Sequence, residues 1–334
     1  MTTLVDNEHI SGFERHLRIL QALSDISIKM YCRRVEEFIE WSCDNGNSDI
    51  KELTRKDIEK YLEWCFYNGN KNITRFTKLT ALTKFFRYLV YENVIEKDIT
   101  ADIPKPKIWS KFIQKFTQPE ILNFFAQIDI STEKGIRDVV IFILAVFGGL
   151  RVSEIINMTL NDVVDDGSSF SINVINSKHH GHRVVYFWKV PSDFIRQLLL
   201  VRLAYEAKGD SALIVSYSKS GKPKGRKLTA PAINNLLKKY AAEAHIRKPE
   251  IHMHMLRATH ASDLRFIRGY DTPAIAERLG HKSIMTTDKY LPSRKRIHKV
   301  YPSLAVYWKD FARCWKGEMQ DDPNIRSGSY DKDG

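Results

Sequence analysis

The chain has 334 residues and a formal charge of +12 at pH 7, with 43% hydrophobic and 11% aromatic residues. This length suggests about two domains, and the apolar content excludes a chain that is disordered throughout. Residues 317–334 carry five acids and two bases, so residues 1–316 hold a net charge of +15. Such an excess favours a polyanionic partner, nucleic acid above all.

A membrane or secreted protein is not indicated. The longest apolar run, residues 139–150, is well short of the roughly 20 residues that a membrane span needs. Asp6 and Glu8 stand where an export signal would have its apolar core, so we expect no export. The four cysteines include no C-x-x-C pair, which is typical of reduced thiols in a cytosolic protein.

Residues 1–102 are predicted to form a helical domain, because apolar residues recur there at helical spacing. Thr54 followed by Asp57 predicts a capping box at the start of one helix. A longer helix follows the Asn68-Gly69-Asn70 break, and three cations are spaced to share one of its faces: Lys71, Arg75 and Lys78.

Residues 103–116 are predicted to be a linker, since Pro104 and Pro106 cannot continue a helix. A second domain, residues 117–316, is expected to open with a Thr117–Glu120 capping box. It should be mainly helical with a small β-hairpin, followed by a mobile acidic tail over residues 317–334. The expected helices are 135–147, 192–208, 229–244, 253–267, 273–279 and 303–316, and the expected hairpin strands are 169–175 and 183–188.

The turn before Arg151 gives this arginine a special setting. Gly148-Gly149 ends the preceding helix, and a glycine pair lets the backbone turn sharply and aim the arginine into a cleft. Glu154 follows one helical turn later and can orient the guanidinium. Each residue also has a plainer interpretation, as an ordinary helix-start arginine and a surface ion pair.

His254 and Arg257 are three positions apart and therefore project from one helix face. A solvated helix surface would show the same spacing. His252, His254 and His260 also raise the possibility of a metal site, but there is no H-E-x-x-H motif, and residues two apart on a helix face away from each other. We expect neither a metal nor a cofactor.

The segment Leu279-Gly280-His281-Lys282-Ser283-Ile284-Met285-Thr286-Thr287-Asp288-Lys289-Tyr290 is the most informative part of the chain. Gly280 should end a short helix and leave His281 at its exposed end. Tyr290 alone would be taken for a packing residue. Two arginines, two histidines and a tyrosine are, however, the groups that can cleave a phosphodiester without a metal ion.

In this order and with Lys178 between them, these residues resemble the active-site signature of tyrosine recombinases, the phage-integrase family. The resemblance implies that Arg151 and Arg257 bind the scissile phosphate, that His254 transfers a proton and that His281 bonds a non-bridging oxygen. Tyr290 would be the nucleophile and Glu154 a supporting residue. Lys178 would be the general acid in the hairpin turn; His179 or His182 could share that role, or Lys178 could only bind phosphate.

The resemblance also implies that residues 1–102 are a SAM-like core-binding domain, which with the catalytic domain clamps duplex DNA. Lys71, Arg75 and Lys78 are then candidates for DNA contacts, although a solvated basic face is an equal alternative. The basic segment 219–227 reads as a flexible loop that could follow phosphates through Lys222, Lys224, Arg226 and Lys227. The helix expected at 303–316 could pack on its own domain or on an adjacent protomer.

The function implied is site-specific recombination through a 3′-phosphotyrosyl link and a Holliday junction, by an integrase or transposase of a mobile element or a dimer resolvase. The expected partners are double-stranded DNA sites and, on DNA, a homotetramer; without DNA we expect a monomer or weak oligomer. It would act in the cytoplasm, at the nucleoid, and not at a membrane. Two alternatives remain: DNA relaxation like that of type IB topoisomerases, and a non-catalytic DNA-binding regulator.

Overall fold

The computed structural model describes residues 7–108, 114–167, 169–176, 181–188, 190–218, 220–266, 268–281 and 287. The chain divides into two compact units, residues 1–110 and 111–334, and the division falls within the expected linker 103–116. Ile103 packs in the core of the first unit and Phe116 in the core of the second. The expected helix 303–316 and the tail 317–334 lie outside the described residues.

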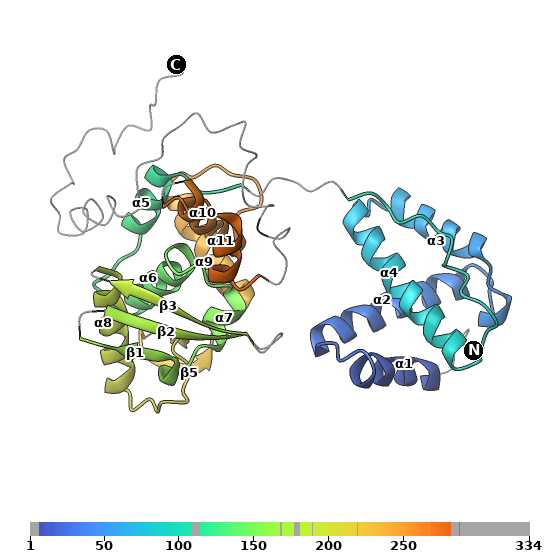
Figure 1. The fold of residues 1–334 in the computed structure, drawn as a ribbon, viewed down its shortest axis with the longest axis horizontal. Coiled ribbons are helices and arrows are strands. Elements are labelled where there is room, and N and C mark those ends of the chain that lie inside the picture. The colour runs from blue at the N-terminus through green and yellow to red at the C-terminus, as the bar shows by residue number, and fades with distance from the viewer. Residues whose placement is uncertain are drawn as a thin grey trace, which may run out of the picture. The chain divides into compact units, whose positions relative to one another are not determined.

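The described part of the first unit is helical, as the apolar spacing predicted (Figure 1). Thr54 and Asp57 form the predicted capping box, in which the Asp57 carboxylate accepts from the Thr54 backbone N at 2.9 Å and from its hydroxyl at 2.7 Å. The aromatic rings of Phe38 and Tyr61 meet edge to face in the core. The helices are α1 (Asn7–Ile19), α2 (Asp25–Asp44), η1 (Ile50–Glu52), α3 (Arg55–Tyr67) and α4 (Asn72–Tyr91).

Lys78 does not lie on an exposed face of α4, contrary to our expectation. Only 5% of the residue is exposed. Its Nζ lies 3.3 Å from Glu37 Oε2 on α2 and 5.1 Å from the centroid of the Tyr61 ring. The reason is that α2 and α3 cover this side of α4, so the ammonium finds its partners inside the unit.

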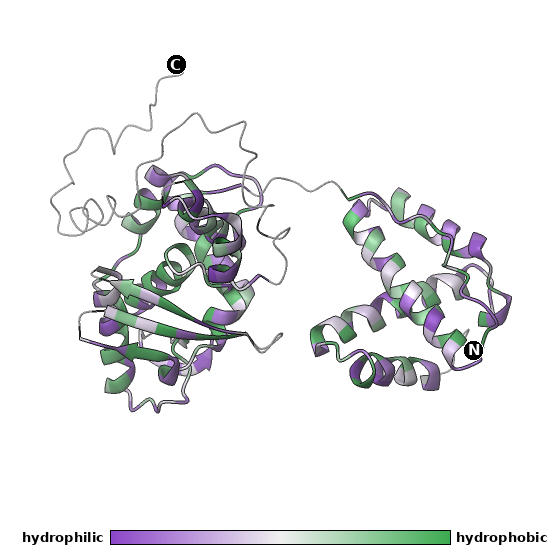
Figure 2. Ribbon diagram, viewed as in Figure 1, coloured by the Kyte–Doolittle hydropathy of each residue, from purple (hydrophilic) through white to green (hydrophobic). Residues whose placement is uncertain are grey.

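The second unit has a central helix, α6 (Glu133–Val146), which is mostly green in Figure 2; its apolar residues are buried, except Ile136, which is partly buried. Such a helix is hydrophobic all round because it is the core and not a surface element. The other helices in the described part of this unit are α5 (Gln118–Ala126), α7 (Val152–Asn157), η2 (Leu160–Asp162), α8 (Val190–Ala204), α9 (Ala230–Glu243), α10 (Met253–Phe266) and α11 (Thr272–Leu279).

The predicted hairpin is present as β2 (Ser169–Asn176) and β3 (Gly181–Trp188), an antiparallel pair to which β1 (Val163–Asp165) adds a third strand. Val174 on β2 is opposite Arg183 on β3. Phe170, Ile172 and Phe187 are buried on the core side of the sheet, which gives the alternation expected of a sheet with one solvated face.

The basic segment near residue 224 is a strand and not a flexible loop, which corrects our expectation. It forms β5 (Pro223–Lys227), antiparallel to β4 (Val215–Tyr217). Backbone pairing with the buried Val215 holds it in place. Its four cations all lie on the exposed surface: Lys222 just before the strand, then Lys224, Arg226 and Lys227.

Candidate active site

Arg151 is placed by the sharp turn that ends α6. Gly149 has φ +64°, and an added Cβ there would lie 2.5 Å from the His260 ring, so both the conformation and the space favour glycine. Arg151 then caps α7, and its backbone N donates to Glu154 Oε2 at 2.8 Å. The Arg151 guanidinium donates to Glu154 Oε1 at 2.8 Å and to the Gly280 carbonyl at 3.1 Å.

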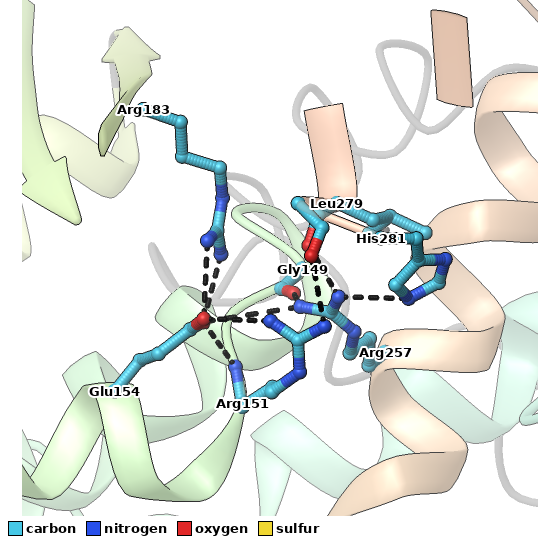
Figure 3. A network of polar contacts seen from close by, with 8 residues as sticks. Gly149, Arg151, Glu154, Arg183, Arg257, Leu279 and His281 are labelled. Carbon is cyan, nitrogen blue, oxygen red and sulfur yellow. Dashed lines mark hydrogen bonds and ion pairs between the residues drawn. The ribbon is translucent and has the colours of Figure 1, made fainter. Parts of the chain in front are cut away.

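Arg257 reaches the same place from α10. Its side chain is only 1% exposed, and its guanidinium donates to the carbonyls of Gly149 and Leu279. Its Nη1 also lies 3.8 Å from Glu154 Oε2. The two predicted arginines therefore meet at one carboxylate, although 106 positions separate them in the chain (Figure 3).

His281 joins the arginines at the end of α11. The helix stops at Leu279 because Gly280 takes the left-handed conformation, with φ +63°, as the Leu-Gly-His pattern predicted. His281 Nε2 lies 3.0 Å from Nη2 of Arg257. Burial first, then the positive charges of Arg257 and Arg151, lower the pKa of His281 to about 3, so the ring is neutral at pH 7.

His254 lies one turn before Arg257 on α10, on the exposed side of the helix. Partial burial of its ring, followed by the charges of Arg257, His252 and Arg151, lowers its pKa to about 4. The ring is therefore neutral at pH 7 and has a lone pair that can accept a proton, but burial and the neighbouring positive charges make it a weaker base than a free imidazole.

Glu154 lies at the centre of the site, and Arg183 holds its carboxylate through two hydrogen bonds. Arg183 Nη2 donates to Glu154 Oε2 at 2.7 Å, and Nη1 donates to Oε1 at 3.0 Å. In Figure 3 the Arg183 side chain extends from β3 to the carboxylate between the arginines. Burial alone would raise the pKa of Glu154, but the bonds and charge of Arg183, with the Arg151 N–H and the Arg257 charge, lower it to about 2.

Arg183 was missing from our predicted site, although the sequence held a signal for it. Strand residues two apart share a face, so Arg183 lies on the same face of β3 as Val185 and the buried Phe187. A cation on the core side of a strand needs a buried anionic partner, and Glu154 was already a candidate.

His260, which we considered as a metal ligand, packs against the Gly149 turn instead. Its Nδ1 lies 3.1 Å from the Val146 carbonyl oxygen, and its ring occupies the space beside Gly149. Among the residues that the structure describes, no three His, Cys, Asp or Glu side chains are grouped so as to hold a metal ion.

Two predicted catalytic residues, Lys178 and Tyr290, lie outside the described residues. Thr287, three positions before Tyr290, is described; it is fully buried, and its Oγ1 lies 2.7 Å from His281 Nδ1.

No helix in the described part of the chain is both long and apolar enough to cross a membrane.

The cations proposed for DNA contacts lie in different surroundings. Lys71, at the start of α4, is exposed, whereas Arg75 is half-buried with its guanidinium 4.9 Å from the Phe66 ring centroid. Lys78 is buried, and the cations of β5 are exposed. Surface position alone therefore favours Lys71 and β5 as candidates.

Comparisons with known proteins identify two family models that match the chain. The model of the phage integrase family matches residues 111–296, and that of the phage integrase N-terminal SAM-like domain matches residues 10–93. The tyrosine recombinase XerC of Bacillus subtilis strain 168 is 29% identical over 301 residues, which cover 87% of this chain and 94% of the relative.

Solved structures with the same fold include the XerH site-specific recombinase bound to a palindromic difH substrate, in a post-cleavage complex. It has a TM-score of 0.67 and 19% identity, and the match covers 94% of this chain and 91% of that one. A lambda integrase tetramer bound to a Holliday junction has a TM-score of 0.65 and 16% identity, with 86% and 78% covered. At these identities the likeness concerns the fold.

Proposed function

Since the chain belongs to the phage integrase family of tyrosine recombinases, we propose that it is a site-specific DNA recombinase that acts through a 3′-phosphotyrosyl intermediate. The observation that carries this proposal is the convergence of Arg151, Arg257 and His281 on one site around Glu154. Two guanidiniums can neutralise the charge that develops on the non-bridging oxygens of a phosphodiester.

In the proposed reaction, the Tyr290 phenolate oxygen attacks the phosphorus, and the bond to the 5′ oxygen breaks. His254 takes the phenol proton, Lys178 gives a proton to the 5′ oxygen, and His281 donates to a non-bridging oxygen. The phosphotyrosyl link keeps the bond energy, so the reverse attack by a 5′ hydroxyl reseals DNA without ATP. Arg257 is almost completely buried. A phosphate can therefore reach its guanidinium only after the contacts to the carbonyls of Gly149 and Leu279 rearrange.

We extend to this chain the assembly named for the lambda integrase structure, a tetramer on a Holliday junction. Four protomers on two duplex sites would then exchange one strand pair and afterwards the other. As outcomes we propose integration or transposition of a mobile element, or resolution of replicon dimers, on DNA in the cytoplasm. The junctions formed on DNA that flanks the encoding gene would distinguish these outcomes.

The test is covalent capture on nicked suicide duplexes made from that flanking DNA. The unaltered chain should form an adduct stable to denaturant, also in the presence of EDTA. Tyr290→Phe should form none and bind the duplex within about twofold of the same affinity, since only the nucleophilic oxygen is lost. Tyr186→Phe, a change of an exposed tyrosine on β3, is the matched control and should form the adduct.

An adduct that persists in Tyr290→Phe would place the nucleophile elsewhere. Loss of activity in EDTA would contradict a clamp made of arginines alone. Relaxation of supercoiled plasmid without sequence preference would favour topoisomerase activity over recombination. Binding without cleavage of every flanking duplex would favour the non-catalytic regulator.

A further inference from the structure

The imidazole of His281 has a contact at each ring nitrogen. Nε2 lies 3.0 Å from Arg257 Nη2, and Nδ1 lies 2.7 Å from Thr287 Oγ1. The Thr287 hydroxyl is buried with its residue, and the reaction outlined above gives it no role. These two contacts together restrict where the imidazole carries its proton.

A guanidinium has N–H donors and no acceptor, so Nε2 must be the acceptor in the contact with Arg257. A neutral imidazole has one N–H, which then belongs to Nδ1 and donates to Thr287 Oγ1. The cations near this ring are Arg257 on α10, Arg151 before α7 and Arg183 on β3, and their charges disfavour a second proton on the ring.

This tautomer cannot perform the role that His281 has in the proposed reaction. A donor to a phosphate oxygen must carry a proton, and Nδ1 is already bonded to Thr287. When a phosphate replaces the Arg257 contact, one N–H bond must break at Nδ1 and another must form at Nε2. Water can carry the proton, and the net charge of the ring does not change. Nδ1 is then an acceptor that needs a donor.

We propose that the Thr287 hydroxyl serves both tautomers of His281, accepting from Nδ1 in the free protein and donating to Nδ1 when DNA phosphate is bound. A hydroxyl offers one donor and two acceptor lone pairs, so rotation about the C–O bond suffices. Thr287 is thus a positioning residue that acts through His281. The inference rests on the proposed function, since the second state requires a phosphate.

Nuclear magnetic resonance of the full chain, labelled with ¹⁵N-histidine, tests the inference directly. Two-bond proton–nitrogen correlations report which ring nitrogen is protonated, and His281→Gln identifies the signals among the eleven histidines. In the Tyr290→Phe background, which prevents cleavage, His281 should carry its proton on Nδ1 when free and on Nε2 with the duplex. Thr287→Ser should behave in the same way, whereas Thr287→Val, which offers Nδ1 neither an acceptor nor a donor, should show a mixture of both tautomers with DNA.

Cleavage rates give the second readout, with Tyr290 intact. Thr287→Val should slow single-turnover cleavage about tenfold, the rate equivalent of one lost hydrogen bond, and Thr287→Ser should restore most of the rate. If valine disturbs packing, as melting curves would reveal, the pair Thr287→Ser and Thr287→Ala isolates the hydroxyl.

A free protein protonated on Nε2 would overturn the inference, as would a serine variant as slow as the valine variant. Failure of the proposed function is distinguishable. In that case the unaltered chain forms no adduct on any duplex, while the spectra of the free protein still report the tautomer.

Discussion

Arg183 on β3 and Glu154 on α7 face each other through two hydrogen bonds, with Nη2–Oε2 at 2.7 Å and Nη1–Oε1 at 3.0 Å. Both side chains are largely buried, at 11% and 6% exposure. The same carboxylate contacts Arg151 and Arg257. Glu154 therefore connects the β2–β3 pair, whose strands flank Lys178 in the sequence, to both candidate phosphate-binding arginines.

Replacing Arg183 should lower both the stability of the second unit and the rate of DNA cleavage. Arg183→Met removes two charge-assisted bonds but leaves Glu154 paired with Arg151, so the free energy of unfolding should fall by about 2 kcal/mol. Single-turnover cleavage should slow at least about tenfold because the orientation of Arg151 and Arg257 is lost. The stability and the cleavage rate of Arg183→Lys should lie between those of the unaltered chain and of Arg183→Met, since an ammonium cannot make the two paired bonds.

Urea unfolding and cleavage on suicide duplexes measure these two effects. The matched control is Arg196→Met, whose guanidinium bonds Asp165 at a more exposed position on α8, where solvent screens the ion pair and little stability depends on it. If Arg183→Met and Arg196→Met gave the same stability and the same rate, Arg183 would have no special role.

Glu154 should make stability depend on pH in acid. Its pKa is about 2 in the folded chain, below the ordinary value of 4.5, so the unfolded chain binds the proton more tightly. The resulting stabilisation is complete above about pH 4.5 and is lost as the pH falls towards 2, by about 3 kcal/mol in all. Glu154→Gln should flatten the unfolding free energy across this interval. An unchanged slope in the glutamine variant would refute the assignment.

Much of the fold and the site could be predicted because the signals are local. Capping boxes at Thr54 and Thr117 and the glycine after Leu279 mark helix ends through their own hydrogen bonds and backbone angles. The convergence of Arg151, Arg257 and His281 has no local signal; it was predicted from the resemblance of these motifs, in their order, to the signature of tyrosine recombinases.

The features that were missed depend on neighbours. Helical spacing grouped Lys78 with Lys71, but it does not reveal which polar stripe another helix covers. The cation-rich segment 223–227 contains Gly225 and no β-branched residue, and only pairing with β4 makes it a strand. To predict Arg183, one must recognise that it shares the core-facing side of its strand with Phe187, and then match it with an acid far away in the sequence, Glu154.

Lys78 should affect stability and not DNA binding. Lys78→Met removes the contact to Glu37, which keeps its bond to Arg34 at 2.8 Å, so the free energy of unfolding should fall by about 1 kcal/mol. DNA affinity should stay within about twofold, with an unchanged salt dependence. Lys71→Ala, at an exposed position, should instead reduce the slope of log K against log salt by about 1. Fluorescence anisotropy at several salt concentrations measures the DNA affinity and the salt slope of both variants. A smaller slope for Lys78→Met than for the unaltered chain would show that Lys78 contacts DNA.

The cations of β5 should contribute sequence-independent affinity. Lys224 and Arg226 are exposed on a strand that is held by pairing with β4, so they can approach phosphates without the entropy cost of ordering a loop. The double variant Lys224→Ala/Arg226→Ala should lower the salt slope by about 2 and weaken binding equally for specific and unrelated duplexes, because phosphate contacts carry no base information. Lys239→Ala, an exposed cation on α9 that is paired with Glu243, is the charge control. A loss confined to the specific duplex would mean that β5 reads bases, and no loss at all would place the DNA on another face of the second unit.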